Sequence, residues 1–298
     1  MALSRSPDET SEEINSDPYY IEASQLLFAE NSDGVEGSVA MIYKGNWIDK
    51  DIKVAIKAIN LKEQSSEECD REKNIMQGLA HPNIVTFLGY SETSLSTGSA
   101  YLIVMECITK GDLWERIGST RMPEWKERLA IMSGITSGVA YLHSVNIIHC
   151  DIKPENVLLG DNDQVKLCDF GSAEQINESK STQTTGGINE IRVTRSTGGT
   201  MGYLPPESCP ESSTVTKKYD IYSLGMTFFE TACWKIAYEH DSREEIIRKT
   251  IKGEREKITT ECPKKMKKII ETCWAQDPEN RPEAESVCSS LDLLRHSM

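Results

Sequence analysis

The chain of 298 residues lacks the features that mark several classes of protein. No apolar run approaches the roughly 18 residues that a membrane-spanning helix needs. The first residues, MALSRSPDETSEEINSDP, lack the apolar core of a secretory signal peptide. Lys and Arg number 33 against 47 Asp and Glu, and the formal net charge of −14 argues against nucleic acid or an anionic membrane surface as a partner. We therefore predict a soluble cytoplasmic protein without a membrane span.

Cysteine pairs with metal-ligand spacing are also missing. The nine cysteines are odd in number and scattered, and no two of them form a C-x-x-C motif. This pattern predicts reduced thiols in a reducing compartment and argues against a zinc site.

The N-terminal segment is polar and acidic and shows no hydrophobic periodicity. We predict that residues 1–18 form a disordered tail. Most of its charge comes from acidic residues that precede Tyr19, namely Asp8, Glu9, Glu12, Glu13 and Asp17.

The first part of the chain after the tail has the alternating apolar pattern of strands. A helix is predicted from Ser65 to Leu79, ending near Gly78, because His81 and Pro82 stop it. The predicted strands cover residues 24–29, 39–45, 53–60, 84–90 and 100–107.

The remainder of the chain has helical periodicity. From Trp125 to Ser144 the apolar residues recur every three or four positions, which predicts an amphipathic helix. Further helices are predicted over residues 218–234, 242–252, 263–274 and 284–296. The long segment 172–200 is rich in Ser, Thr and Gly and is typical of a functional or disordered loop. The sequence therefore predicts an α+β protein with a small sheet-rich part and a larger helical part.

Two segments of the sheet-rich part have the residues for phosphate binding. The turn DGVEGSV contains Gly34 and Gly37, which would let backbone N–H groups approach a phosphate, although a tight turn alone explains two glycines. Lys57 ends the apolar strand VAIK and would need a partner if buried, which Glu72 on the next helix could supply. A solvated charge at the edge of the sheet is the alternative for Lys57.

The segment HCDIKPENVLL, His149 to Leu159, combines an acid, a base and an amide. It is followed by CDFG, which contains Cys168 and Asp169. A polar turn between two buried strands would explain the pattern. Alternatively, Asn156 and Asp169 supply the oxygen ligands that Mg²⁺ prefers, Asp151 orients a hydroxyl nucleophile, and Lys153 neutralises charge on a transferring group.

Taken in order, these motifs resemble the eukaryotic protein kinase superfamily over about residues 21–294. The resemblance includes HPNIV at His81, GTMGYLPPE ending at Glu207, DIYSLG at Asp220 and the late Arg281. It implies a bilobal kinase fold, with a small antiparallel β-sheet lobe carrying one main helix at residues 19–106 and a larger α-helical lobe at residues 107–298. It also implies ATP and Mg²⁺ as cofactors and a protein substrate.

The resemblance further implies a role for each matching residue. Asp151 would be the catalytic base, Lys153 would touch the γ-phosphate, Lys57 paired with Glu72 would contact the α/β-phosphates, and Asn156 and Asp169 would hold Mg²⁺. The residues implied in nucleotide binding are Gly34, Gly37, Val39, Ala55, Lys57, the gatekeeper Met105, the hinge residues Glu106 to Ile108, Leu158 and Cys168. Met76, Phe87, His149 and Phe170 would stack between the lobes, and Glu207 would form a structural ion pair with Arg281.

The type of kinase is indicated by residues near the catalytic segment. Lys153 and Thr200 match serine/threonine kinases, so we expect an intracellular signalling kinase of that specificity. The C-terminal ETCWAQDPENRPEAESV resembles the tyrosine-kinase-like group, which includes RIP, mixed-lineage and Raf-type kinases. DFGSAE and SLDLLRH are similar to segments of the Mos kinase.

Two residues depart from the pattern of the family. Ser32 replaces the first glycine of G-x-G-x-x-G, which would weaken nucleotide binding slightly. Cys150 replaces an arginine that grips a phosphate on the activation segment, and a thiol cannot do this, so control by loop phosphorylation is in doubt. With the acidic tail, these departures motivate an alternative: a pseudokinase scaffold that binds nucleotide or a partner without turnover.

Overall fold

The structure, a computed structural model, falls into two compact units that are described separately. Unit 1 comprises Met1–Gln64 and Leu88–Met105, and unit 2 comprises Ser65–Phe87 and Glu106–Met298. The described residues are 17–29, 35–36, 40–95, 98–119, 121–162, 164–176, 199–208 and 215–297. All but the last two residues of the predicted disordered tail lie outside them, as does most of the predicted loop at 172–200.

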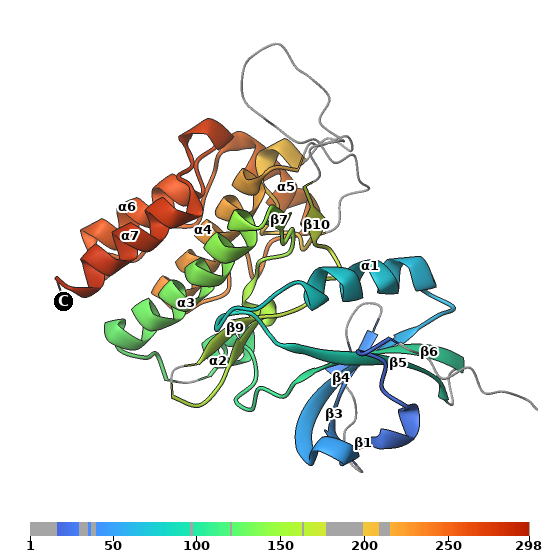
Figure 1. Ribbon diagram of the computed structural model, residues 1–298. Helices are drawn as coiled ribbons and strands as arrows, with labels where there is room; N and C mark the ends of the chain where they lie inside the picture. Colours follow the sequence, from blue (N-terminus) through green and yellow to red (C-terminus); the bar gives the residue numbers. More distant parts are fainter. Residues whose placement is uncertain are drawn as a thin grey trace, which may run out of the picture. The chain divides into compact units, whose positions relative to one another are not determined.

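Unit 1 is built on a curled β-sheet (Figure 1). Its strands are β1 (Leu26–Phe28), β2 (Val35–Glu36), β3 (Ala40–Trp47), β4 (Ile52–Asn60), β5 (Phe87–Leu95) and β6 (Gly98–Glu106). The order is β1-β3-β4-β6-β5, and β2 also pairs with β3. β3 pairs antiparallel with β1, β2 and β4, and its connection to β4 turns at Asp51, whose φ of 51° is left-handed.

The alternation of side chains along β4 gives the sheet one buried face. Val54, Ile56 and Ala58 point into the core of unit 1, where they meet Leu102 and Val104 of β6. Ala55 and Lys57 therefore project from the opposite face of the same strand.

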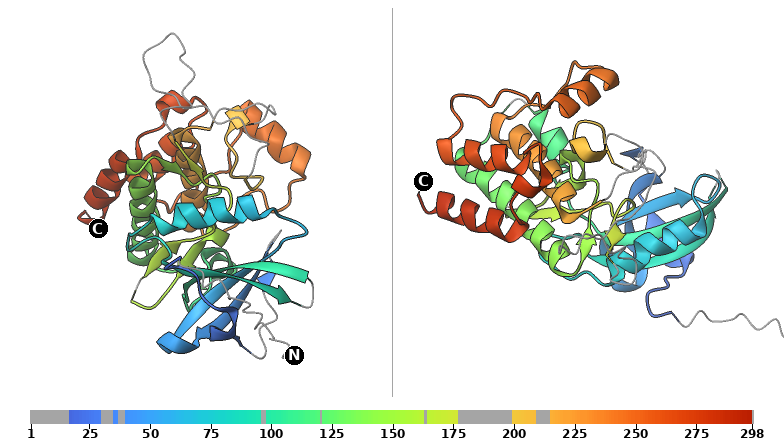
Figure 2. Two further views of the ribbon diagram at one scale, coloured as in Figure 1. Left: turned by 45° about the vertical axis from the view of Figure 1, so that its right-hand side comes forward. Right: turned by 90° about the horizontal axis from the view of Figure 1, so that it is seen from above.

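Unit 2 is mainly helical. Its helices are α1 (Ser66–Gln77), α2 (Leu113–Ile117), α3 (Trp125–Ser144), α4 (Lys217–Cys233), α5 (Arg243–Lys252), α6 (Lys264–Cys273) and α7 (Ala284–Arg295). α3 packs against α4 and α7, and α6 packs against the same two helices, as the two views of Figure 2 also show. α4 is the central helix of this packing, because every residue from Tyr219 to Ala232 is buried.

Two pairs of short strands in unit 2 hold the segment between α3 and the end of CDFG. β7 (Ile147–Ile148) pairs with β10 (Glu174–Gln175), and β8 (Val157–Leu159) pairs with β9 (Val165–Leu167), both antiparallel. A 3₁₀ turn at Pro154–Asn156 leads into β8.

The structure confirms the predicted fold class, with helices close to their expected limits, and corrects one strand. The strand predicted at residues 84–90 begins at Phe87 and runs to Leu95. Ile84 and Val85 instead lie beside Leu167 at the end of β9, where Ile84 forms a bridge and Val85 N–H donates to the Leu167 carbonyl. Their apolar character reflects burial against β9. Among the described residues, no helix is long and apolar enough to cross a membrane.

Candidate functional site

The polar residues of HCDIKPENVLL converge on the side chain of Asp151, between β7 and β8. Thr200 donates to Oδ1 from its backbone N–H (3.0 Å) and from its hydroxyl (2.9 Å). Lys153 Nζ lies 2.9 Å from Oδ2, and Asn156 Nδ2 donates to the same oxygen at 3.0 Å. Both oxygens therefore have fixed partners, and charge-assisted bonds of this kind hold a carboxylate in one orientation.

Lys153 and Thr200 also contact each other, which closes the cluster. Lys153 Nζ donates to Thr200 Oγ1 at 2.5 Å, although the two residues are 47 positions apart. The structure thus brings Asp151, Lys153 and Asn156 together as predicted and adds Thr200. We call these four residues the Asp151 cluster.

Asn156 of the cluster and Asp169 both carry side-chain oxygen atoms that suit a hard cation. Asn156 is buried and commits its amide nitrogen to the carbonyl and carboxylate of Asp151, which leaves its side-chain oxygen for another partner. Its backbone carbonyl accepts from Cys168 N–H at 3.0 Å, and this bond joins the segment to the residue that precedes Asp169. Asp169 has a φ of 62°, a left-handed conformation that a non-glycine residue adopts only where its surroundings impose it.

Asp220 at the start of α4 fixes the backbone before Asp151. Its carboxylate is fully buried and accepts from His149 N–H, Cys150 N–H and His143 Nε2, each at 2.9 Å. These three donors offset the cost of burying the charge. They also hold Cys150 at a φ of 64°, so Asp220 imposes the left-handed turn that leads into Asp151.

The Cys150 side chain lies in an apolar environment. It is buried with Ile148, Val215 and Tyr219, and partly buried Ile176 and Leu204 pack against them. The position where the resembling family carries a phosphate-binding arginine is therefore filled by apolar packing.

His149 joins the two motifs through both ring nitrogens. Nδ1 accepts from Asp151 N–H at 3.3 Å, so Nε2 carries the proton and donates to the Cys168 carbonyl at 3.1 Å. The His149 ring also lies 5.1 Å from the ring of buried Phe170. Two members of the predicted stack are therefore in contact, while Met76 and Phe87 are buried residues of the same unit.

Glu106, a predicted hinge residue, is fixed by its side chain. Oε1 accepts from Thr86 N–H (2.7 Å), the Thr86 hydroxyl (2.6 Å) and buried Lys166 Nζ (2.5 Å). Burial alone would raise the pKa of Glu106, but the hydrogen bonds from Lys166 and Thr86 outweigh it and lower the pKa. The backbone N–H of Glu106 donates to the Thr86 carbonyl at 3.0 Å.

The other predicted nucleotide-binding residues are placed as follows. Ala55 and Lys57 share a face of β4, and buried Met105 lies in β6 of unit 1. Ile108 and Cys168 are half-buried residues of unit 2, and Leu158 faces Lys166 across the β8–β9 pair. Glu72 is a buried residue of α1 in unit 2, and its pairing with Lys57 of unit 1 stays a prediction. Gly34, Gly37 and Val39 lie outside the described residues.

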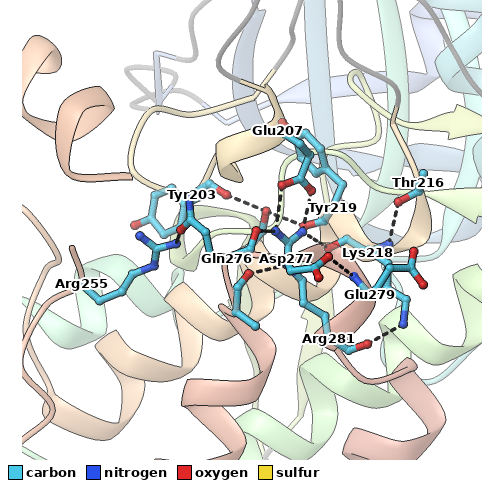
Figure 3. A network of polar contacts seen from close by, with 12 residues as sticks. Tyr203, Glu207, Thr216, Lys218, Tyr219, Arg255, Gln276, Asp277, Glu279 and Arg281 are labelled. Atoms are coloured by element: carbon cyan, nitrogen blue, oxygen red, sulfur yellow. Dashed lines mark hydrogen bonds and ion pairs between the residues drawn. The ribbon is translucent and has the colours of Figure 1, made fainter. Parts of the chain in front are cut away.

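The predicted ion pair between Glu207 and Arg281 is confirmed (Figure 3). Arg281 Nη1 and Nη2 donate to the two carboxylate oxygens of Glu207 at 2.6 and 2.8 Å. The Arg281 side chain, 1% exposed, also donates to the carbonyls of Ala275, Lys218 and Gln276. Because Glu207 ends GTMGYLPPE, this pair ties the segment after Thr200 to the helical part of unit 2.

Tyr203 of the same segment, GTMGYLPPE, bonds to a buried carboxyl group of α4. Glu230 of α4 accepts from the Tyr203 hydroxyl at 2.9 Å and from Ala237 N–H at 2.7 Å. Burial raises the pKa of Glu230 to about 8 in spite of these two bonds. Burial also raises the pKa of nearby Glu155.

Asp220, Glu230 and Lys166 were not predicted as parts of the site. One signal in the sequence points to the two acids, because they are the only charged residues of α4 after Lys218 and an acid in a buried helix requires partners. Apart from Ala237, seven positions from Glu230, the partners come from segments 27 to 77 positions away, which no local pattern identifies.

The chain is similar to known proteins over most of its length. Residues 34–291 match the family described as "Protein kinase domain". A probable LIM domain-containing serine/threonine-protein kinase of Dictyostelium discoideum is 28% identical over 88% of this chain and 38% of its own length. The receptor-like protein kinase ANXUR2 of Arabidopsis thaliana is 31% identical over 86% of this chain and 31% of its own length.

A third relative, the probable serine/threonine-protein kinase drkD of Dictyostelium discoideum, is 29% identical over 86% of this chain and 19% of its own length. The chain therefore spans well under half the length of these relatives.

Proposed function

We propose, for a chain that belongs to the protein kinase domain family, that it transfers the γ-phosphate of ATP to Ser or Thr hydroxyls of a protein substrate. The names of its relatives support serine/threonine specificity. The observation that supports the proposal is the Asp151 cluster, in which a carboxylate, an ammonium and an amide, groups that phosphoryl transfer uses, lie within hydrogen-bond distance of one another.

In this reaction Asp151 is the group that receives the proton of the substrate hydroxyl. The hydroxyl oxygen forms a bond to the γ-phosphorus, the bond to the β,γ-bridging oxygen breaks, and ADP leaves. Thr200, Lys153 and Asn156 orient the Asp151 carboxylate, which general-base catalysis needs within hydrogen-bond reach of the nucleophile. Lys153 also carries the positive charge that offsets charge on the transferring group.

Asn156 and Asp169 fit a magnesium ion. Amide and carboxylate oxygens are the hard ligands that Mg²⁺ takes, and a site completed by phosphate oxygens and water needs only one or two protein side chains. Bound there, the ion would neutralise the phosphates. The structure's contribution is to hold Asn156 by its amide nitrogen, so that its oxygen is available.

The remaining roles concern the nucleotide. Lys57, paired with Glu72, contacts the α/β-phosphates, and Gly34 and Gly37 cover them. Glu106 donates its N–H to Thr86, so its carbonyl is the backbone atom that remains for adenine, next to Cys107 and Ile108. Val39, Ala55 and Leu158 sandwich the adenine ring, and Met105 and Cys168 complete the pocket.

The test is transfer of label from radiolabelled ATP with Mg²⁺ to a generic basic protein, followed by acid hydrolysis and separation of phosphoamino acids. We expect label on phosphoserine and phosphothreonine. Label confined to phosphotyrosine would contradict the assigned specificity. A thermal shift with ATP and Mg²⁺ but no transfer would instead support the pseudokinase scaffold, which Ser32 and Cys150 motivate.

A further inference from the structure

The loop between α5 and α6 lines a cavity of about 470 Å³ in unit 2, and none of its lining residues is among those assigned to catalysis. We call it the basic cavity, because Arg255, Lys257, Lys264 and Lys267 line it and only two acids, Glu256 and Glu271, do so. This local excess of two positive charges lies on a chain whose net charge is −14. Such a reversal of sign attracts an anionic partner.

The acids of the basic cavity do not neutralise its lysines. Glu256 pairs at 2.8 Å with Lys235, which does not line the cavity. Glu271 is 3.7 Å from Lys267, with both side chains about half exposed, and exposed pairs of this kind contribute little. Among the described residues, Lys257 and Lys264 have no ion-pair partner.

Arg255, one of the residues that line the basic cavity, is held in place by hydrogen bonds. The Arg255 guanidinium donates to the carbonyls of Thr250 (3.3 Å) and Glu254 (3.2 Å) and to Gln276 Oε1 (2.8 Å). Figure 3 shows Arg255 beside Gln276, whose backbone carbonyl accepts from Arg281. A cation already held in place loses little conformational freedom when an anion arrives.

Part of the lining of the basic cavity is apolar. Ile258, Cys262 and Trp274 line it, and each is less than a tenth exposed. A simple inorganic anion would leave this surface without a partner, whereas a peptide that carries both carboxylates and an apolar side chain would use both parts.

We propose that the basic cavity is a docking site for an acidic peptide segment of a partner protein. Carboxylates of the segment contact Lys257 and Lys264, and an apolar side chain packs against Trp274 and Ile258. Docking at this site does not involve Asp151, so it is separable from phosphate transfer.

The test is a fluorescence anisotropy titration of the full chain with a fluorescein-labelled peptide of alternating Glu and Leu. The Asp151→Asn variant serves as the host protein, so that binding is measured without turnover. We expect saturable binding that weakens at high salt, and binding at least about tenfold weaker to the peptide with Gln in place of Glu.

Two matched double variants decide whether the cavity is the site. Lys257→Glu with Lys264→Glu is expected to weaken binding of the Glu peptide at least about tenfold. Lys53→Glu with Lys126→Glu, which changes the net charge equally at exposed positions outside the cavity, is expected to leave the affinity within about twofold. All four lysines are exposed, so thermal melting should show both variants folded.

Three results would overturn the proposal. Equal weakening by both double variants would mean that overall charge attracts the peptide. Equal binding of the Glu and Gln peptides would mean that carboxylates are not recognised. Absence of saturable binding to the Asp151→Asn host would exclude docking, and it would leave the proposed phosphate transfer unaffected.

Discussion

At the scale of single residues, the candidate site depends on buried groups whose partners are distant in sequence. Asp220 holds Cys150 in a left-handed conformation, and this turn delivers Asp151 to Lys153 and Thr200. Cys150 itself is packed among apolar side chains. The geometry of the segment is therefore fixed from α4, which offers a physical route to an ordered Asp151 without an arginine–phosphate contact.

The raised pKa of Glu230 predicts how stability depends on pH. Between about pH 4.5, where the unfolded carboxyl titrates, and about pH 8, the folded chain holds a proton that the unfolded chain has released. Stability therefore falls as pH rises through this window. The Glu230→Gln variant does not titrate, so its free energy of unfolding relative to wild type should rise by about 2 kcal/mol from about pH 5.5 to about pH 7.5.

The measurement is urea unfolding of wild type and Glu230→Gln at both pH values. Because other titrating groups are common to the two proteins, the difference isolates Glu230. A difference that stays constant with pH would show that Glu230 titrates normally.

At the scale of elements, the helices of unit 2 were the best-predicted part of the fold. α3 has the predicted limits, Trp125 and Ser144. α5 begins where its capping box starts, because Ser242 and Glu245 satisfy each other's backbone N–H groups. Signals of this kind are local, so they can be read from the sequence.

The elements that were not predicted from the sequence depend on contacts with a neighbouring segment. α2 and the short strands β7 to β10 are too short for a periodic pattern, and they form because a partner segment lies beside them. The Asp151 cluster was predicted in part, since Asp151, Lys153 and Asn156 lie in one motif, but the bond from Lys153 to Thr200 comes from tertiary structure.

The Glu207–Arg281 pair connects two elements of unit 2. Of the connections described above, this is the one whose loss should lower the free energy of unfolding most. In Arg281→Met, Glu207 and the carbonyls of Ala275 and Lys218 lose the hydrogen bonds that Arg281 donates. We expect the free energy of unfolding to fall by about 3 kcal/mol, as for other broken buried pairs.

Arg248→Met is the matched control, because Arg248 pairs with Glu254 at the surface with both side chains about half exposed. This substitution should lower the free energy of unfolding by less than about 1 kcal/mol. Urea unfolding of both variants gives the comparison, and equal losses would contradict the structural role assigned to Arg281.

At the scale of the whole molecule, the chain is a kinase domain with the segment HCDIKPENVLL in one compact unit and the β4 face with Ala55 and Lys57 in the other. The roles of Lys57 and Glu72 depend on how these units meet, and they stay proposals. The chain spans 38% or less of the length of the curated relatives described above, so substrates and regulation of the whole protein are also proposals.

The most direct test of the proposed function is the rate of phosphate transfer by Asp151→Asn beside wild type and Asp292→Asn. Asp292 is an exposed residue of α7, so its variant controls for the loss of one carboxylate. We expect Asp151→Asn to lower kcat by a factor of about 100 or more, as for loss of a general base, and Asp292→Asn to match wild type. Equal kcat values for all three proteins would contradict the role of Asp151.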